Sequence, residues 1–525
     1  MRAGVACARR PWKSERIERV AGGFGRHTMT GQVMTLANST HSAPRRSALK
    51  VGVAFAALLR LGWTERARAQ APAPVGPVFR PETYGARGDG ATNDTDAFVA
   101  MSAAVQAAGG GTIELAPRKT YIVGRQRFLG GRSTRGDIVA ETLSYLPSRI
   151  IFLRGLAGGV AIRGNGARLR AADGLRYGTF DPATGHANEH KMPYGGNDIA
   201  YPYDAMINLH DIAGPVRIED VELDGNCDRY VWGGPRGDTG WQLPGNGMLI
   251  EGCAHVAINR VDSHHHGLDG LQCGSRESFA VSNSRFHHNC RLNGNLRSGA
   301  NFVATDCDFD FAAKGAHFSA PAGGFDLEAE IAGDPILAPR FVRCRFRHNR
   351  YQGMASDSGD VWGASFDHCL FWSGAHQESN PVYVSRPHFT FTSCTFGGPL
   401  IVLEPSLRDK RLPLFTGCLF TDDPRLGSLD RTVSTETSNI NVASGGVMFR
   451  ACRFLFTRSR VPGIANPRVV FERCVLANSP KIYTVISGTF RDCRITGASI
   501  DLNNSSSARF EGRTTLNGRP VPARG

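Results

Sequence analysis

The sequence of 525 residues lacks a long apolar run and, over most of its length, a charge excess of one sign. A bilayer-spanning helix needs about 20 apolar residues, and the apolar run at 51–59 is much shorter, so we predict no membrane span. Residues 1–69 hold 13 of the 61 Lys and Arg and 3 of the 47 Asp and Glu, leaving 48 and 44 in the rest. This near balance argues against a nucleic-acid partner.

In the sequence, no close Cys and His pairs have the ligand spacing that is typical of zinc sites. We predict no cofactor and find no calcium motif, so calcium is an unsupported alternative and the metal stays unknown. Twelve of the 13 cysteines lie after residue 69, and free cysteine is among the most buried residue types. We expect free thiols, eight of which recur at one repeat position and form one interior column: Cys307, Cys344, Cys369, Cys394, Cys418, Cys452, Cys474 and Cys493.

The basic N-terminus has the pattern of an export signal. Arg45-Arg46 is a twin-arginine pattern, and Ala67-Arg68-Ala69 is a small-x-small cleavage site. We therefore predict a leader at 1–69, a Pro-rich linker at 70–83 and a periplasmic or secreted protein. Three methionines are alternative initiators: Met1, Met29 and Met34.

A sequence motif, Phe-x-x-Cys-x-apolar, recurs in the C-terminal half and begins at positions 341, 366, 391, 415, 449, 471 and 490. Looser copies begin at 218, 258, 281 and 304. A repeat of about 20–50 residues is typical of a solenoid. Within one copy, Cys344 and Phe346 have the two-residue period of a strand and face inward. The three-residue step before them breaks that period and predicts a corner between two strands, as in a parallel β-helix.

Residues 84–124 resemble a known family. The stretch Tyr84-Gly-Ala-Arg-Gly-Asp-Gly-Ala-Thr-Asn-Asp-Thr95 is followed by a helical apolar pattern, by Gly109-Gly-Gly-Thr-Ile and by Pro117-Arg-Lys-Thr-Tyr121. These motifs resemble the N-terminal cap of the pectate-lyase-like, rhamnogalacturonase/epimerase-type superfamily, although Asn93 replaces the usual Asp. The resemblance implies an all-β, right-handed parallel β-helix with a short N-terminal capping helix. We expect one domain at 84–525, with caps at 84–124 and 500–525.

The resemblance implies architecture rather than a reaction, because the superfamily includes polysaccharide lyases, glycoside hydrolases, epimerase-like proteins and phage tailspikes. The paired aspartates and Gly-His-Gly of polygalacturonases, the Asp-Pro-His of mannuronan epimerases and the calcium cluster of pectate lyases are not found at matching positions. No known catalytic set can therefore be transferred.

Long gaps between copies predict three insertions, near 225–247, 310–335 and 421–445. Long loops on a rigid solenoid commonly form its binding face. The first insertion contains Trp232 and Trp241, which either stack on sugar rings or pack the loop onto the helix. The second contains Lys314 and His317.

The densest polar segment, 262–270, lies between the first two insertions. Aligning Gly270, Gly299 and Gly353 places the starts of neighbouring strands side by side and predicts a groove across 262–357. We predict five catalytic residues, His266, Asp269, Arg297, Asp326 and Glu328. We predict five substrate-binding residues, Trp232, Trp241, Lys314, His317 and Arg350.

Two chemistries suit this groove. A lyase needs a base and a cation beside the uronate carboxylate, for which His266, Arg297 and Lys314 are available. A hydrolase needs two carboxylates, such as Asp269 with Asp326 or Glu328. We predict an exported lyase or glycoside hydrolase acting on an acidic or neutral polysaccharide, with a uronate-containing polymer as one candidate, as a monomer or homo-oligomer. The alternative is a non-catalytic carbohydrate-binding or surface-structural protein, in which the His run is a solvated turn and Arg297 pairs with Asp326.

Overall fold

The computed structural model describes residues 76–134, 142–191, 198–235, 242–315, 317–331, 333–356, 358–374, 380–384, 386–398, 400–402, 412–433, 440–442, 446–457, 468–478, 484–485, 487–497, 500–501 and 508–523. All of them belong to one compact unit, 73–525. The predicted leader at 1–69 lies outside the described residues, so the export signal stays a prediction.

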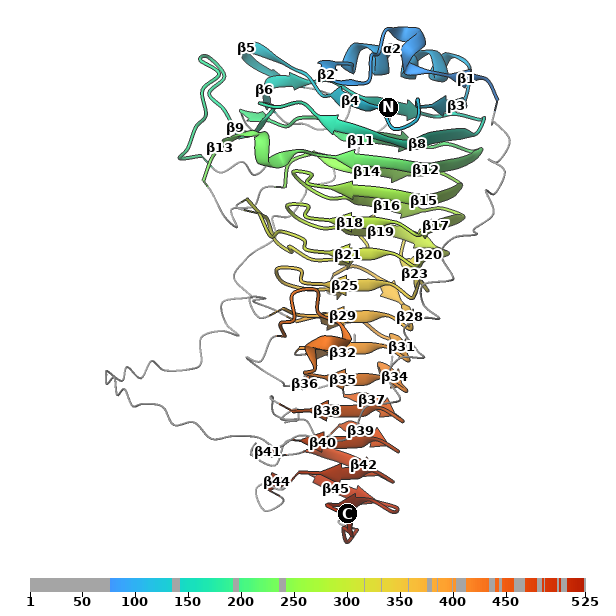
Figure 1. Ribbon diagram of the computed structural model, residues 1–525, viewed down its shortest axis with the longest axis vertical. Helices are drawn as coiled ribbons and strands as arrows, with labels where there is room; N and C mark the ends of the chain where they lie inside the picture. Colours follow the sequence, from blue (N-terminus) through green and yellow to red (C-terminus); the bar gives the residue numbers. More distant parts are fainter. Residues whose placement is uncertain are drawn as a thin grey trace, which may run out of the picture. The chain divides into compact units, whose positions relative to one another are not determined.

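One helix, α2 (Thr95–Ala107), caps the first coils (Figure 1). It buries Phe98, Met101 and Val105, the apolar pattern that predicted it. The side chain of Asn93 accepts a hydrogen bond from the Thr95 amide at 3.1 Å, so it satisfies a backbone donor at the start of the helix. The predicted capping helix is confirmed. The described residues also contain three 3-10 turns: η2 (Pro81–Tyr84), η3 (Cys227–Arg229) and η4 (Pro424–Leu426).

The coils that follow are built from parallel strands stacked one coil on the next (Figure 1). Sheet A begins with β1 (Val78–Phe79), β2 (Asp89–Asn93), β3 (Gly111–Glu114), β4 (Thr120–Val123), β8 (Val160–Ala171), β12 (Pro215–Asp224) and β15 (His255–His264). It then divides into two series, so each later coil contributes two short strands. The predicted parallel β-helix is therefore confirmed by the strand pairing.

The first series is β17 (Ser278–Ser282), β20 (Phe302–Thr305), β24 (Arg340–Val342), β28 (Ser365–Asp367), β31 (Thr390–Thr392), β34 (Leu414–Thr416), β37 (Val447–Arg450), β39 (Val469–Glu472), β42 (Gly488–Arg491) and β45 (Ala508–Glu511). The second is β18 (Arg285–His287), β21 (Asp308–Asp310), β25 (Arg345–Arg347), β29 (Leu370–Trp372), β32 (Thr395–Gly397), β35 (Leu419–Thr421), β38 (Arg453–Phe456), β40 (Val475–Asn478), β43 (Arg494–Thr496) and β46 (Thr515–Leu516), with β47 (Arg519–Pro520) antiparallel to the last.

A further sheet completes each coil. It comprises β7 (Ile151–Arg154), β11 (Ala205–His210), β14 (Asn246–Glu251), β16 (Leu271–Ser275), β19 (Gly294–Ala300), β22 (Phe325–Leu327), β26 (Met354–Ser356), β30 (Val382–Val384), β33 (Leu400–Val402) and β36 (Ile440–Val442), with β23 (Ile336–Leu337) and β27 (Val361–Trp362) beside it. A separate pair is β41 (Thr484–Val485) with β44 (Ile500–Asp501).

The repeat positions pair in the predicted register from Ile218 through Ile258, Val281 and Ala304 to Phe341. The phenylalanines that follow stack between coils, as in Phe391 on Phe415 at 4.5 Å between ring centroids. The twelve cysteines of the described residues are all free and buried. Within the column their thiols contact the preceding coil, as where the Cys394 thiol donates to the Phe366 carbonyl at 3.4 Å.

The three-residue step from Phe to Cys in the repeat forms a corner, and one residue of this corner has a left-handed backbone conformation. Its second residue has positive φ in every Phe-x-x-Cys copy, for example 52° at Arg343, 52° at Ala451 and 64° at Gly417. Residues other than glycine pay about 1–2 kcal/mol for this conformation. The structure thus contains the corner predicted from the break in period, and most copies form it with a residue other than glycine.

One small sheet was not predicted from the repeat. It contains β5 (Gln126–Thr134), β6 (Thr142–Pro147), β9 (Arg176–Thr179), β10 (Ile199–Ala200) and β13 (Val231–Gly233). Its strand β13 comes from the first insertion and sets Trp232 in register with Tyr177 of β9. This pairing fixes the position of the Trp232 indole, which was predicted to lie on a loop.

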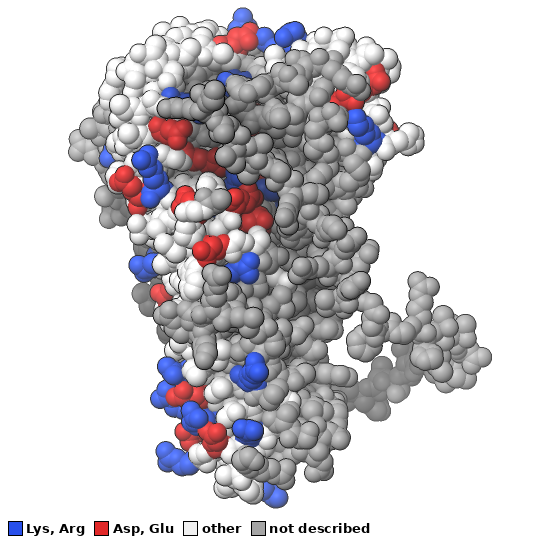
Figure 2. Space-filling view, turned by 180° about the vertical axis from the view of Figure 1, so that it is seen from behind, with Lys and Arg blue, Asp and Glu red and all other residues white. Residues whose placement is uncertain are grey.

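No helix among the described residues is long and apolar enough to cross a membrane. Basic and acidic side chains lie side by side on the face drawn in Figure 2, in agreement with the near balance of charge after residue 69.

Candidate functional site

The predicted glycine alignment agrees with the strand register at Gly270 and Gly353 but is wrong at Gly299, and this changes the predicted groove. Leu271 pairs with Gly294, whereas Gly299 pairs with Ser275, well inside the strand. Arg297 therefore lies inside β19, whereas His266 and Asp269 lie in the corner before β16, so the three residues are not at equivalent positions of their coils. The alignment failed because neither glycine of β19 matches Gly270: Gly294 pairs with Leu271, so Gly270 lies one position earlier, opposite Asn293.

His266 and Asp269 are fully buried. The His266 ring contacts the Tyr203 hydroxyl at 3.2 Å and the Leu223 carbonyl at 3.1 Å, and burial lowers its pKa well below the usual value. Asp269 accepts a hydrogen bond from Arg291 Nε at 2.8 Å in an ion pair that is itself buried. Both side chains thus hold the interior of the corner between β15 and β16.

Arg297 is paired with two carboxylates, Glu251 at 2.6 Å and Glu330 at 2.7 Å, rather than with Asp326. Asp326 is buried on β22, and Glu328 accepts a hydrogen bond from the Ser358 hydroxyl at 2.8 Å. None of the predicted catalytic residues lines the cavity described below.

Of the predicted substrate-binding residues, Arg350 also lies away from that cavity, and Trp241 is not described by the structure. The guanidinium of Arg350 packs over the Phe318 ring at 3.5 Å from its centroid.

A cavity of about 220 Å³ is formed where residues of the first two insertions meet the corners of the coils between them. It brings together three predicted substrate-binding residues, Trp232, Lys314 and His317. The Trp232 and His317 rings stack at 3.9 Å with 11° between their planes, and Lys314 is exposed. The described lining residues are Cys227, Asp228, Trp232, His265, His288, Cys290, Lys314, Gly315 and His317.

Sequence analysis missed His265 and His288 as site residues. Each is the first residue after its strand, β15 or β18, and has positive φ, 54° and 55°. Their rings stack at 5.1 Å with 7° between planes, because parallel strands place equivalent residues of successive coils one above the other. The signal was available: a His-His pair recurs at 264–265 and 287–288, one coil apart.

Behind this pair lies a second pair, His264 and His287, which is also stacked, at 4.8 Å. Nδ1 of His287 lies 2.8 Å from Nδ1 of His288, and its Nε2 lies 2.9 Å from the Asp262 carboxylate. This places the His287 proton on Nε2, facing the carboxylate, so His287 Nδ1 accepts from His288 Nδ1–H. His288 Nε2 then carries a lone pair.

The environment keeps both lining imidazoles uncharged at neutral pH. Burial, with the neighbouring His287, lowers the pKa of His288 to about 4. Burial and the neighbouring His264 also lower the pKa of His265. The cavity therefore offers unprotonated imidazole, an ammonium group and an aromatic platform, which are the types of group used for proton abstraction beside an anionic group.

No family model and no curated protein matches the chain. Among solved structures, the chain is similar to the catalytic domain of Agl-KA at 13% identity and a TM-score of 0.46, covering 84% of this chain and 68% of that one. It is similar to the A-module of mannuronan C-5 epimerase AlgE4 of Azotobacter vinelandii, at 13% identity, a TM-score of 0.39, and 86% and 98% coverage.

A third similar structure is the surface adhesin PfbA of Streptococcus pneumoniae, at 13% identity, a TM-score of 0.39, and 84% and 93% coverage. Likenesses at this level bear on fold alone, and the parallel β-helix rests on the strand pairing described above. The activity has to be argued from the cavity.

Proposed function

We propose that this protein is a polysaccharide lyase that cleaves a uronate-containing polymer at the cavity between the first two insertions. The observation that carries the proposal is that a neutral imidazole, His288, and an ammonium group, Lys314, line the same small volume. A lyase needs this combination: a base for the C5 proton and a cation for the adjoining carboxylate.

In the proposed step, His288 Nε2 takes the C5 proton of the uronate. The electron pair left on C5 forms the C4=C5 double bond, and the C4–O bond breaks. The leaving oxygen takes a proton from water, and the proton on His288 returns to the solvent. Lys314 neutralises the carboxylate, which carries part of the negative charge while the C5 proton is being removed.

The stack of Trp232 and His317 supports a carbohydrate ligand, because flat aromatic surfaces suit the apolar faces of sugar rings. The cavity, at about 220 Å³, is smaller than the 300–1,000 Å³ typical of ligand pockets. We therefore propose that it holds one sugar residue while the rest of the polymer lies outside.

A hydrolase has less support. Two carboxylates must flank the bond that is cleaved, and Asp228 is the only carboxylate among the described residues that line the cavity. The carboxylate pair predicted from the sequence, Asp269 with Asp326 or Glu328, does not support a hydrolase either, because Asp269 is bound to Arg291 in the interior.

The proposal is tested by incubating the purified protein with a panel of uronate and neutral polymers and identifying the products by mass spectrometry. A lyase gives fragments with an unsaturated terminal uronate, and Lys314→Met lowers kcat/KM on uronate polymers by at least tenfold, with Lys119→Met as the exposed control. Saturated fragments would indicate a hydrolase. Binding without any product would support the non-catalytic alternative.

A further inference from the structure

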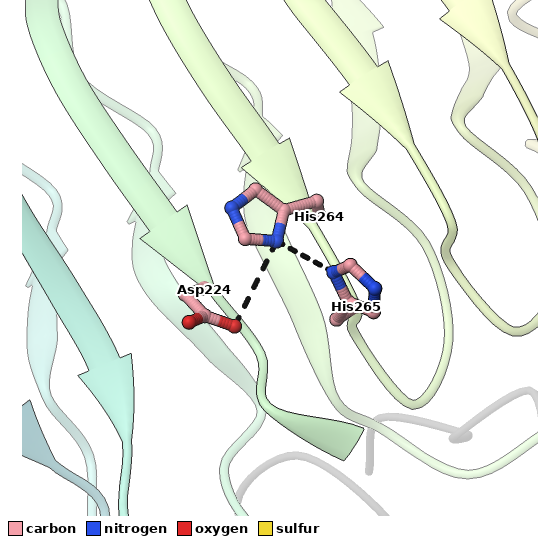
Figure 3. Close-up of side chains that lie close together, drawn as sticks. All are labelled: Asp224, His264 and His265. Carbon is pink, nitrogen blue, oxygen red and sulfur yellow. Dashed lines mark hydrogen bonds and ion pairs between the residues drawn. The ribbon is translucent and has the colours of Figure 1, made fainter. Parts of the chain in front are cut away.

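Three metal-ligating atoms converge beside the cavity, on the neighbouring strands β12 and β15 and the corner that follows β15 (Figure 3). Nδ1 of His264 lies 2.7 Å from Nδ1 of His265 and 3.7 Å from Oδ1 of Asp224. All three atoms lie within 4.8 Å of one another. They come together because Asp224 and His264 occupy paired positions on parallel strands and His265 is the next residue.

With neutral imidazole rings, one proton is not enough to form hydrogen bonds among all three atoms. His264 Nε2 lies 3.1 Å from the Glu222 carboxylate. A ring that donates from Nε2 to this carboxylate and carries one proton has a lone pair on Nδ1. A proton on His265 Nδ1 can bridge the two rings, but Asp224 Oδ1 then still faces a lone pair. A cation placed among the three atoms is attracted by all of them.

We propose that Asp224, His264 and His265 bind a divalent transition metal ion of the zinc type. Two imidazoles and one carboxylate form the N,O ligand set preferred by such ions, whereas calcium prefers an all-oxygen site. Three protein ligands leave coordination positions for water or a ligand oxygen. Bonds of about 2.1 Å require ligand atoms about 3.0–3.4 Å apart, so the two rings separate by a few tenths of an ångström on binding.

The groups around the site match what a bound metal requires. Metal-ligating histidines commonly donate their other ring N–H to a carboxylate, and His264 does so to Glu222. Glu222 is held in turn by Arg168 at 2.8 Å. Asp224 is oriented by the Asn226 amide, which donates to it at 2.9 Å.

A neighbouring group, Asp262, His264 and His287, has similar spacing. It would use the Nε2 side of His264, which already hydrogen-bonds Glu222. Because one nitrogen cannot both donate a proton and ligate a metal, we place the ion on the Nδ1 side, against Asp224 and His265.

This inference does not rest on the proposed lyase activity. His265 also lines the cavity, and a metal on its Nδ1 leaves a proton on Nε2, so that Nε2 becomes a hydrogen-bond donor toward a ligand. His288 lies outside the metal set and keeps its own lone pair.

The test is isothermal titration calorimetry of the full chain, stripped with a chelator, with zinc chloride and no polymer present. We expect one site of micromolar or tighter Kd. Asp224→Asn and His265→Asn should each weaken it at least tenfold, and asparagine is tolerated at the positive φ of residue 265. The matched control His255→Asn, on an exposed histidine of the same strand, should bind as the wild type does.

Cobalt(II) provides a second readout, because direct nitrogen ligation changes its visible absorption and this change should be smaller in His265→Asn, which retains only the His264 imidazole. Melting temperatures without metal show whether each variant folds. Absence of stoichiometric zinc binding to the wild type, or wild-type affinity in both site variants, would overturn the proposal. Loss of polymer cleavage with zinc binding intact would instead count against the lyase.

Discussion

Trp232 and His317 stack face to face at 3.9 Å, although one belongs to the first insertion and the other to the second. The indole N–H donates to the Cys227 carbonyl at 3.2 Å, and the ring contacts Tyr177 edge-on. The stack therefore joins both insertions at the wall of the cavity.

Replacing Trp232 with Ala should weaken binding of uronate oligosaccharides about tenfold and raise KM more than it lowers kcat, because the platform binds the sugar without taking part in bond cleavage. Titration calorimetry and steady-state kinetics measure the two effects. Trp362→Ala, outside the cavity on β27, is the control. Unchanged KM in Trp232→Ala would contradict a sugar platform.

Asp269→Asn should destabilise the fold by about 3–5 kcal/mol, because it leaves the buried guanidinium of Arg291 without its counter-charge. Chemical denaturation measures this loss. Asp269→Leu combined with Arg291→Met should recover part of it. A stable Asp269→Asn variant that lacks only activity would show a catalytic aspartate instead.

The corner between the two series of sheet A offers a matched pair of substitutions. Gly417→Ala should cost about 1 kcal/mol, since φ is 64° there while an added Cβ meets no atom closer than 3.8 Å. Ala451→Gly at the equivalent corner should stabilise by about 0.5 kcal/mol, because relief of the left-handed strain exceeds the entropy cost of glycine. Thermal unfolding of both variants checks this, and effects of the same sign would contradict it.

Stability should fall as the pH drops below about 6.5, in part through His348. Its Nε2 accepts a hydrogen bond from the Leu429 amide at 3.0 Å. Burial lowers its pKa, helped by Lys314 and Arg347, while Asp430 acts in the opposite direction.

The unfolded chain therefore binds a proton near pH 6.5 that the folded chain does not, and stability is complete above this pH. The loss from this group cannot exceed about 1.4 kcal/mol per pH unit. His348→Asn should flatten the dependence of melting temperature on pH between 7.5 and 5.5. An unaltered slope in this variant would show that His348 does not contribute.

The sequence predicted the solenoid, the register of its repeat positions and its cap because these depend on local patterns. The spacing of Ile218, Ile258 and Val281 matches the strand pairs of the structure. The pair at His264 and His265 was visible too, but its partners Glu222 and Asp224 lie about one coil earlier. Only the stacking of strands brings those side chains together.

Other features could not be derived in this way. The side sheet that positions Trp232 pairs β13 with β9, which lies more than 50 residues earlier in the chain and outside the repeat. The buried ion pair of Asp269 with Arg291 turned a candidate catalytic carboxylate into an interior one, and neither sequence spacing nor residue type distinguishes these roles.

The central claim is that His288 abstracts a proton in the cavity, and the most direct test is the initial rate of unsaturated-uronate formation by His288→Asn. Asparagine suits the positive φ of this position. We predict a fall in kcat of at least 100-fold with the melting temperature nearly unchanged, and wild-type kcat in the His255→Asn control. Wild-type kcat in His288→Asn would contradict the account.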